Sequence, residues 1–353
     1  MIKKIIALAV MAASLPAFAA SVNCNNYPHW SDCAGSPQLA AIDAFIHGAN
    51  AGKGDVAVFD WDGTLFDEKI PVPPGFHYEV GHEFAGQPLW FLWGAEQNNP
   101  AYFPAFDTAD GDKLANIYRR NDYQEGNSNV SVDDYSKFDE TASIELGMTP
   151  SDVYNSVSAF YSQENLIQYA YLPMLDVVNQ FIQNGYQVYF VSGSNPYYLI
   201  SLLANISQTL GYNLLPKNCD PSNPNLDVCH VTGNATKLDV NGRFSLVYDD
   251  RFVKLPGLPN QSDDLEHIPV DSEGKEFAIA RYVVPQAGHP AVFYAGNSGG
   301  DYEAIDLILN QPNLSTFSIA VNPRGTLLDE VTAYDPGNPA PGAKMAVVTE
   351  SPN

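Results

Sequence analysis

An apolar run that ends in two aspartates is the feature that most constrains the fold of this chain. Residues 56–65 read Val-Ala-Val-Phe-Asp-Trp-Asp-Gly-Thr-Leu. The apolar half predicts a buried strand with the carboxylate of Asp60 at its end, and ligands of open α/β sheets bind outside such strand ends. Gly63 allows a turn that brings Asp62 over Asp60. Two adjacent acids in different surroundings can serve as nucleophile and general acid/base.

Strand and helix patterns alternate along much of the remaining chain. Predicted strands cover 186–191, 291–295 and 317–321, and predicted helices cover 36–51, 174–184, 197–206, 274–282 and 302–309. Strands that alternate with helices are typical of a parallel sheet with helices on both faces. We therefore expect an α/β fold with a Rossmann-like, doubly wound parallel sheet.

Residues 66–170 interrupt this alternation. They begin with a segment rich in Pro, Gly and aromatic residues and contain helix-like pieces at 112–120 and 149–162. This composition predicts a large, mainly helical cap insertion. The core would then comprise residues 20–65 and 171–335, and the Pro-rich residues 336–353 are expected to be a loop-like tail.

The first residues resemble an export signal. A short basic start precedes the mostly apolar residues 5–16, and Ala17-Phe18-Ala19 fits the small-x-small rule for cleavage. We expect a signal peptide over residues 1–19 and a periplasmic or secreted protein. No later segment approaches the ~18 apolar residues that a membrane helix needs, so we expect no membrane insertion.

The charge of the chain limits its partners. The formal net charge is −24, and loss of Lys3 and Lys4 with the signal peptide takes it to −26 (−24 − 2). Such acidity argues against nucleic acid and anionic membranes as partners. An anionic substrate would need a local positive site.

The four cysteines predict two local disulfides. Four cysteines allow three pairings, and the short spacings favour Cys24–Cys33 and Cys219–Cys229. No Cys-x-x-Cys motif occurs, which argues against zinc or redox chemistry. Disulfides agree with the expected export.

Polar groups follow two further predicted strands. Ser192-Gly193-Ser194-Asn195-Pro196 follows one, and Gly296-Asn297-Ser298-Gly299-Gly300-Asp301 follows another. Taken singly, Ser192 is explained as a helix cap, Lys275 as a solvated helix charge, and the glycine-rich turn as an ordinary loop. Their occurrence in this order at successive strand ends points to a shared site.

Phosphate chemistry accounts for the whole set. Asp60 can attack phosphorus and form an aspartyl phosphate, while Asp62 protonates the leaving oxygen and then deprotonates the hydrolytic water. The Ser192 hydroxyl and the Gly193 N–H can hold phosphoryl oxygens near a helix N-terminus. Lys275 can supply the cation that the acidic chain otherwise lacks.

The same residues predict a magnesium site. Asp60, the backbone carbonyl of Asp62, and Asn297 or Asp301 form a set made only of oxygen ligands, which suits Mg²⁺.

These motifs resemble those of the haloacid dehalogenase superfamily of aspartate-nucleophile hydrolases. Residues 60–64 look like motif one, Ser192 like motif two, Lys275 like motif three, and residues 297–301 like motif four. The resemblance covers most of the chain outside the insertion. Residues 234–244, followed by Gly274-Lys275, are similar to the phosphoserine phosphatase branch, and export with a large insertion is similar to secreted phosphorylcholine phosphatases. The resemblance implies a Mg²⁺-dependent phosphomonoesterase acting on a small organic phosphate.

One departure from the family pattern keeps alternatives open. The family usually has Asp where this chain has Asn297, and an amide offers Mg²⁺ an oxygen without a charge. A phosphate-ester-binding protein that has lost turnover is therefore an alternative, as is a broad-specificity acid phosphatase. A dehalogenase is a weaker interpretation, because carbon–halogen displacement does not need an acid at Asp62.

Aromatic residues give the few clues to the substrate. Trp61 lies beside Asp60, and Trp90, Phe91 and Trp93 lie in the insertion. They could form a cage for a quaternary ammonium group, which favours a phosphocholine-like substrate. The alternative is ordinary packing inside the cap.

Overall fold

The fold is known from a computed structural model that describes residues 22–67, 145, 147–163, 165–249, 270–323, 327 and 344–352. The predicted signal peptide, the helix-like piece at 112–120, Trp90 and Trp93 lie outside these residues. No helix within the described ranges is long and apolar enough to cross a membrane.

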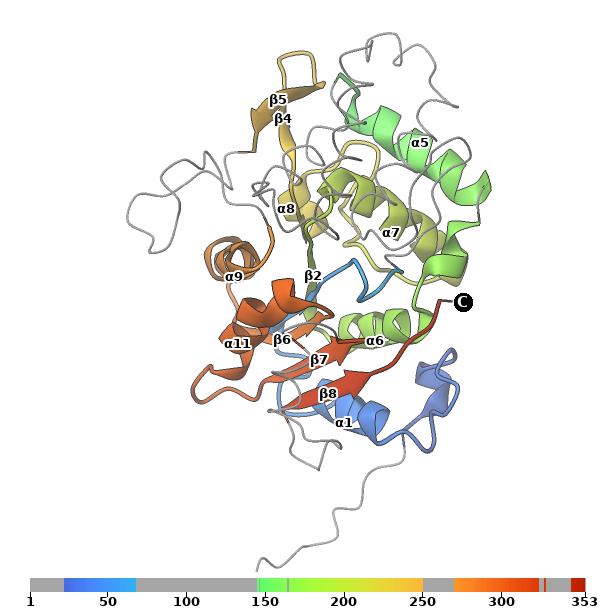
Figure 1. The fold of residues 1–353 in the computed structure, drawn as a ribbon, viewed down its shortest axis with the longest axis vertical. Coiled ribbons are helices and arrows are strands. Elements are labelled where there is room, and N and C mark those ends of the chain that lie inside the picture. The colour runs from blue at the N-terminus through green and yellow to red at the C-terminus, as the bar shows by residue number, and fades with distance from the viewer. Residues whose placement is uncertain are drawn as a thin grey trace, which may run out of the picture.

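A six-stranded parallel sheet forms the centre of the molecule (Figure 1). The strands lie in the order β3-β2-β1-β6-β7-β8, with the bounds β1 Val56–Phe59, β2 Gln187–Val191, β3 Val231–Thr232, β6 Ala291–Gly296, β7 Phe317–Val321 and β8 Met345–Val348. Phe59 is in register with Phe190 of β2 and Ala295 of β6. The loops that follow these three strands therefore leave the sheet at one edge, which confirms the predicted Rossmann-like α/β fold.

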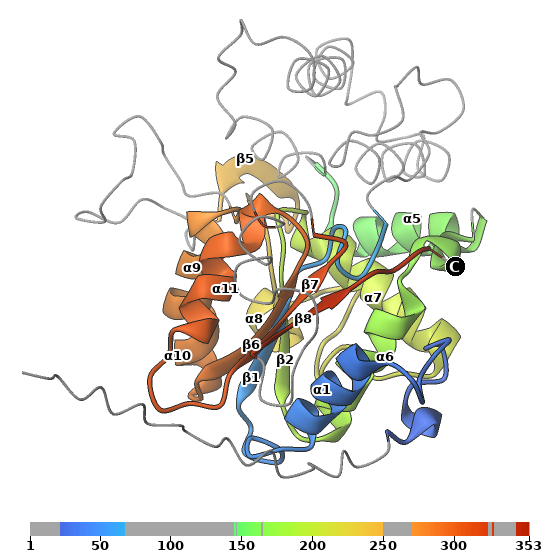
Figure 2. The same cartoon turned by 60° about the horizontal axis from the view of Figure 1, so that its bottom comes forward.

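Helices cover both faces of this sheet (Figure 2). One side carries α1 (Pro37–Ile46), α6 (Leu172–Gln183) and α7 (Pro196–Leu210), and the other carries α9 (Glu273–Ala278), α10 (Val284–Ala287) and α11 (Tyr302–Leu309). Neighbouring residues of β1 point to opposite faces, so Phe59 belongs to one hydrophobic cluster and Val58 to the other. Burial on both faces explains why the strands read as continuous apolar runs.

The predicted helix over 274–282 is not one regular helix, and the helical run extends beyond it to Ala287. Between α9 and α10 lies a turn of π-helix, Ile279–Val283, in which Val284 N–H bonds to the carbonyl of Ile279. Pro285, in the first turn of α10, has no N–H to donate. We attribute the wider turn to this missing donor.

The end of the expected insertion packs on the core. Helix α5 (Pro150–Gln163) lies against α7 (Figure 2). Its apolar residues Val153, Val157 and Phe160 are buried in the same cluster as Phe59. The described end of the insertion is therefore part of the main hydrophobic core.

The expected loop-like tail over 336–353 is wrong for Met345–Val348. These residues form β8, which pairs in parallel with β7 as the last strand of the sheet. Four apolar residues beyond a Pro- and Gly-rich stretch are too few to show a strand period, which is why the sequence did not reveal them.

A small hairpin stands beside the carboxyl edge of the sheet. It consists of β4 (Thr236–Leu238) and β5 (Phe244–Tyr248), which pair antiparallel. Phe244 also exchanges backbone hydrogen bonds of 2.9 Å with Gly147 and Met148. The hairpin therefore holds the insertion just before α5.

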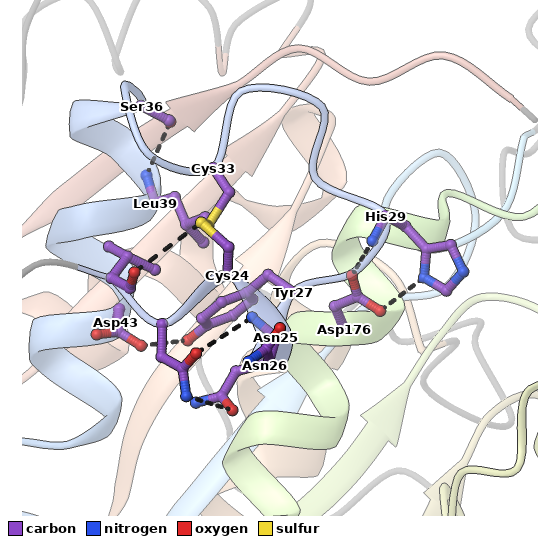
Figure 3. Close-up of a disulfide and its surroundings, with 12 residues drawn as sticks. Cys24, Asn25, Asn26, Tyr27, His29, Cys33, Ser36, Leu39, Asp43 and Asp176 are labelled. Atoms are coloured by element: carbon purple, nitrogen blue, oxygen red, sulfur yellow. Dashed lines mark hydrogen bonds and ion pairs between the residues drawn. A yellow bond between two sulfur atoms is a disulfide. The ribbon is translucent and has the colours of Figure 1, made fainter.

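Both predicted disulfides are present. Cys24 is bonded to Cys33 and Cys219 to Cys229. Figure 3 shows how the first loop is held: Tyr27 donates a 2.8 Å hydrogen bond to Asp43 of α1. The backbone N–H of His29 donates to Asp176 of α6, and its ring Nδ1 lies 2.8 Å from the same carboxylate.

Candidate active site

Asp60 lies at the carboxyl end of β1, where the sequence predicted it. Its backbone N–H bonds to the carbonyl of Ala295 on β6, and its side chain is buried. Thr64 Oγ1 donates to Asp60 Oδ2 at 3.1 Å, and Lys275 Nζ donates to Oδ1 at 2.9 Å. Both carboxylate oxygens thus have a partner that fixes their direction.

The turn after β1 brings Asp62 to the same site. Gly63 has a φ of 68°, a left-handed conformation that favours glycine. Asp62 Oδ2 accepts hydrogen bonds from Ser192 Oγ at 3.0 Å and from Ser194 Oγ at 2.6 Å. Burial, and then the negative charges of Asp301 and Asp62, raise the pKa of Asp60, although Lys275 lowers it.

The loop after β2 forms the N-terminal turn of α7. Ser192 N–H bonds to the carbonyl of Thr232 on β3, and Ser194 N–H bonds to Ser192 Oγ at 3.1 Å. Asn234 Nδ2 donates to the Gly193 carbonyl at 2.7 Å. These bonds shape a compact loop at the positive end of a 15-residue helix, a suitable place for a phosphoryl group.

Lys275 forms ion pairs with acids that follow two different strands, β1 and β6. Its Nζ lies 2.9 Å from Asp60 Oδ1 and 2.6 Å from Asp301 Oδ1, and its side chain is buried. Burial alone would lower the pKa of Lys275, but the negative charges of Asp301, Asp60 and Asp271 outweigh it and raise the pKa well above its usual range. Lys275 is therefore a permanent buried cation.

The carboxylate of Asp301 is enclosed by donors. Oδ1 accepts from Lys275 Nζ and, at 2.6 Å, from the hydroxyl of Tyr294. Oδ2 accepts from the backbone N–H groups of Asn297 and Ser298 at 2.9 and 3.0 Å. Although burial would raise the pKa of Asp301, Lys275 and these donors lower it. This arrangement suits an ionised acid that anchors Lys275 and the turn after β6.

The donor set of the site fits a hard divalent cation. Asp60 and Asp301 share the buried cation Lys275, and the buried acid Asp62 bonds to two serine hydroxyls instead. Burial, followed by the charge of Asp301, raises the pKa of Asp60 well above its usual value, even though Lys275 lowers it. The negative charge of these acids is therefore only partly balanced. Mg²⁺ would add positive charge, and it prefers oxygen ligands.

The ligands of a metal ion at this site would combine side-chain and backbone oxygens. No group of three or more His, Cys, Asp or Glu residues in the described ranges is arranged to hold a metal. Asp301 already accepts several donors, so it is a weaker candidate for direct ligation than the sequence suggested. The Asp60 carboxylate, the Asp62 backbone carbonyl and the Asn297 side chain are the groups that could hold Mg²⁺.

Trp61 does not line an open surface. Its side chain is fully buried, stacks on Phe66 with ring centroids 5.4 Å apart, and belongs to the hydrophobic core. Its indole N–H has no hydrogen-bond partner among the described residues. This position favours core packing over a place in an aromatic cage, and Trp90 and Trp93 fall outside the described ranges.

Several residues of the site were missed by the sequence analysis. They share a polar contact with a predicted site residue or with the loop that holds it, and they are Thr64, Glu145, Ser194, Asn195, Asn234 and Tyr294. Thr64, Ser194 and Asn195 had a signal, because each lies within two residues of a predicted site residue. Glu145 had none, since its partner Asn195 is 50 residues away.

The first of three matches to solved structures supports the fold. A conserved protein of unknown function from Anaerococcus prevotii DSM 20548 matches with a TM-score of 0.52 at 13% identity, over 90% of this chain and 95% of that one. Cytosolic 5'-nucleotidase IIIB bound to cytidine matches with a TM-score of 0.46 at 13% identity, over 90% and 86%. A haloacid dehalogenase family hydrolase from Salmonella enterica serovar Typhi gives 0.40 at 8% identity, over 78% and 65%. No family model and no curated protein matches the sequence.

The structure places the residues of the four sequence motifs close to one edge of the sheet. The first motif follows β1, the second follows β2, the fourth follows β6, and the lysine reaches the site from α9. The motif residues therefore meet in the order along the chain that the sequence resemblance implies.

Proposed function

We propose that this protein is a phosphomonoesterase of the haloacid dehalogenase superfamily that acts through an aspartyl phosphate on Asp60. The observation that carries the proposal is the meeting of four polar side chains from three separate segments. Lys275 lies 2.9 Å from Asp60, and Ser192 lies 3.0 Å from Asp62. A buried nucleophile, an acid/base, a hydroxyl and a cation are the groups that phosphoryl transfer needs.

In the first step an oxygen of Asp60 attacks phosphorus, and the bond from phosphorus to the leaving oxygen breaks. The leaving oxygen takes a proton from Asp62, so the products are an aspartyl phosphate and a free alcohol. Ser192 and the Gly193 N–H hold phosphoryl oxygens at the N-terminus of α7, and Lys275 compensates their charge.

In the second step Asp62 takes a proton from water, and the water oxygen attacks phosphorus. The bond from phosphorus to Asp60 breaks, which releases inorganic phosphate and restores both acids. The Ser194 hydroxyl can donate to Asp62 when it is ionised and accept from it when it is protonated, so the same contact serves both steps.

Mg²⁺ is the cofactor that we propose. Asp60, the Asp62 carbonyl and Asn297 would hold it, and when bound it would neutralise the charge of the attacking carboxylate and of the phosphoryl group.

Hydrolysis of an aryl phosphate, with and without EDTA, tests the proposal. Asp60→Asn keeps the side-chain shape but removes the nucleophile, so we expect a loss of about 10³-fold or more in kcat. The matched control is Asp55→Asn, a buried acid just before the opposite end of β1, for which we expect a change within about threefold. Activity that survives Asp60→Asn would refute the nucleophile.

The substrate that we propose is a small organic phosphate, with phosphocholine-like esters ranked first. The support for this ranking is the cluster of aromatic residues in the insertion, since Trp61 is buried in the core. Phosphate release over a panel of phosphomonoesters is the test. If choline and ethanolamine esters rank no higher than sugar phosphates or nucleotides, a broad-specificity acid phosphatase is the better description.

We also propose that the protein is exported to the periplasm or secreted. All four of its cysteines are paired in two disulfides, and such bonds persist in oxidising compartments. Cell fractionation followed by N-terminal sequencing tests this proposal: a mature form that begins at Ala20 outside the cytoplasm supports it, and a cytoplasmic form that keeps residues 1–19 contradicts it.

A further inference from the structure

Glu145 is a buried carboxyl that the proposed chemistry does not use. Its side chain is 0% exposed. Oε2 accepts a 2.5 Å hydrogen bond from Asn195 Nδ2, whereas Oε1 has no hydrogen-bond partner in the part of the chain that the structure describes. An acid that is buried with one oxygen unsatisfied is costly, so a reason for its position is needed.

Asn195 connects Glu145 to the phosphate-binding loop. The Asn195 Oδ1 accepts from the backbone N–H groups of Tyr197 and Tyr198, at 2.9 and 3.4 Å, and so caps α7. Its backbone continues the loop Ser192–Ser194, whose two hydroxyls bond to Asp62. The orientation of one amide side chain therefore affects both the helix cap and the loop.

Glu145 is itself held by a rigid frame. The backbones of Gly147 and Met148 form hydrogen bonds with the backbone of Phe244 in β5. Arg243 Nη1 also donates a 2.7 Å hydrogen bond to the Gly147 carbonyl. The ring of Phe244 packs edge-on against Tyr197 in the first turn of α7, with centroids 4.6 Å apart. The hairpin, the end of the insertion and α7 thus form one unit around the Glu145–Asn195 pair.

We propose that Glu145 is a positioning residue, which fixes the Asn195 amide and thereby holds the loop Ser192–Ser194 in the shape that binds phosphate. The inference rests on the proposed phosphatase function of this loop. It assigns a role to a residue that touches neither the phosphoryl group nor Asp60.

The burial of Glu145 is consistent with this role. Burial raises the pKa of Glu145 well above its usual value, although the bond from Asn195 lowers it. The neutral acid is thus the favoured form. A neutral Glu145 leaves the positive end of α7 to the phosphoryl group instead of competing for it, and it predicts that glutamine can replace glutamate here.

Two substitutions and a matched control test the inference. Glu145→Gln keeps an oxygen that can accept from Asn195, whereas Glu145→Ala removes it. The control is Gln180→Ala, which deletes a buried polar side chain near the far end of α6, where its side chain bonds to Gln183. For each variant we would measure the Kd of inorganic phosphate by calorimetry in the presence of Mg²⁺, the kcat and KM for an aryl phosphate, and the Tm.

We expect Glu145→Ala to weaken phosphate binding by about tenfold or more, and to raise KM by a similar factor. Glu145→Gln should stay within about threefold of wild type, and Gln180→Ala should lower only the Tm.

If Glu145→Ala changes the Tm but neither Kd nor KM, Glu145 is merely structural and the inference fails. If wild type binds phosphate without turnover, the proposed function fails while the Kd values still decide the role of Glu145. If wild type binds no phosphate, both fail.

Discussion

Ser194 Oγ donates a 2.6 Å hydrogen bond to Asp62 Oδ2, shorter than the 3.0 Å bond from Ser192 to the same oxygen. In the proposed reaction Ser192 must turn its hydroxyl to a phosphoryl oxygen, and its bond to Asp62 is then lost. Ser194 is left to hold the acid/base in place. In this proposal Ser192 binds the substrate, and Ser194 orients Asp62.

Ser194→Ala should affect kcat more than KM. Asp62 would lose the shorter of its two serine hydrogen bonds, so we expect kcat to fall by about tenfold and KM to change by less than about threefold. Ser192→Ala should show the opposite pattern, with the larger change in KM. Steady-state kinetics on an aryl phosphate measures both, and Ser194→Thr should restore activity because it keeps the hydroxyl. A higher KM at unchanged kcat in Ser194→Ala would mean that Ser194 contacts the substrate instead.

Lys275→Met should both destabilise the fold and abolish phosphate binding. The substitution keeps an unbranched side chain but leaves Asp60 and Asp301 buried without their shared cation. We expect a loss of about 3–5 kcal/mol in the free energy of unfolding, measured in urea. Adding Asp60→Asn should recover part of the loss, because it removes one of the unpaired charges. An unchanged unfolding free energy for Lys275→Met would show that the ion pairs do not form in solution.

Asn297→Asp should lower the Mg²⁺ concentration needed for activity. A carboxylate in place of the amide adds a charge to the metal site, so we expect half-maximal activation at about tenfold less Mg²⁺. The control is Asn50→Asp, a buried asparagine remote from the site that bonds to the Ser315 carbonyl.

The same titration separates an enzyme from a binding protein. If wild type binds phosphate esters without turnover and only Asn297→Asp hydrolyses them, the chain is a binding protein that has lost activity. If the Mg²⁺ requirement does not move, Asn297 is not a ligand.

The sequence predicted the parts of this molecule that depend on neighbouring residues. The apolar run before Asp60 and the glycine after Asp62 identify a strand and a turn, because burial and positive φ are local demands. The meeting of Ser192 with these acids followed from the parallel order of the strands, since all carboxyl ends share one edge, whereas Lys275 reaches them from helix α9. The two short cysteine spacings were equally local, and both pairs were confirmed.

What the sequence could not provide depends on contacts between distant segments. Glu145 meets Asn195 only because the hairpin holds the end of the insertion against α7. The role of Asp301 depends on Tyr294 and Lys275, which both donate to its Oδ1. From the sequence alone, Asp301 was a possible metal ligand. Strand β8 is recognisable only from its pairing with β7, because four residues carry no period.

The acid Glu350, which lies far along the sheet from Asp60, lets us predict how the stability of the fold depends on pH. Glu350 follows β8, where its backbone N–H and carbonyl bond to the side chain of Asn322. Burial, and then the negative charge of Asp176, raises the pKa of Glu350 from its usual 4.5 to about 7. Asp176 is itself buried and accepts hydrogen bonds from the backbone N–H of His29 and, at 2.6 Å, from the hydroxyl of Tyr212.

This shift should make the fold less stable as the pH rises from about 4.5 to 7. In that window the folded state holds a proton on Glu350 that the unfolded chain releases, so the free energy of unfolding falls with pH. Because Glu350 is only half-buried, we expect a loss of roughly 1–2 kcal/mol rather than the full value of the shift. Glu350→Gln should remove that loss at pH 8 and have little effect at pH 4. Urea unfolding at several pH values measures it, with Asp32→Asn as a control that removes one exposed acid. Equal slopes for wild type and Glu350→Gln between pH 4.5 and 7 would show that Glu350 titrates alike in both states.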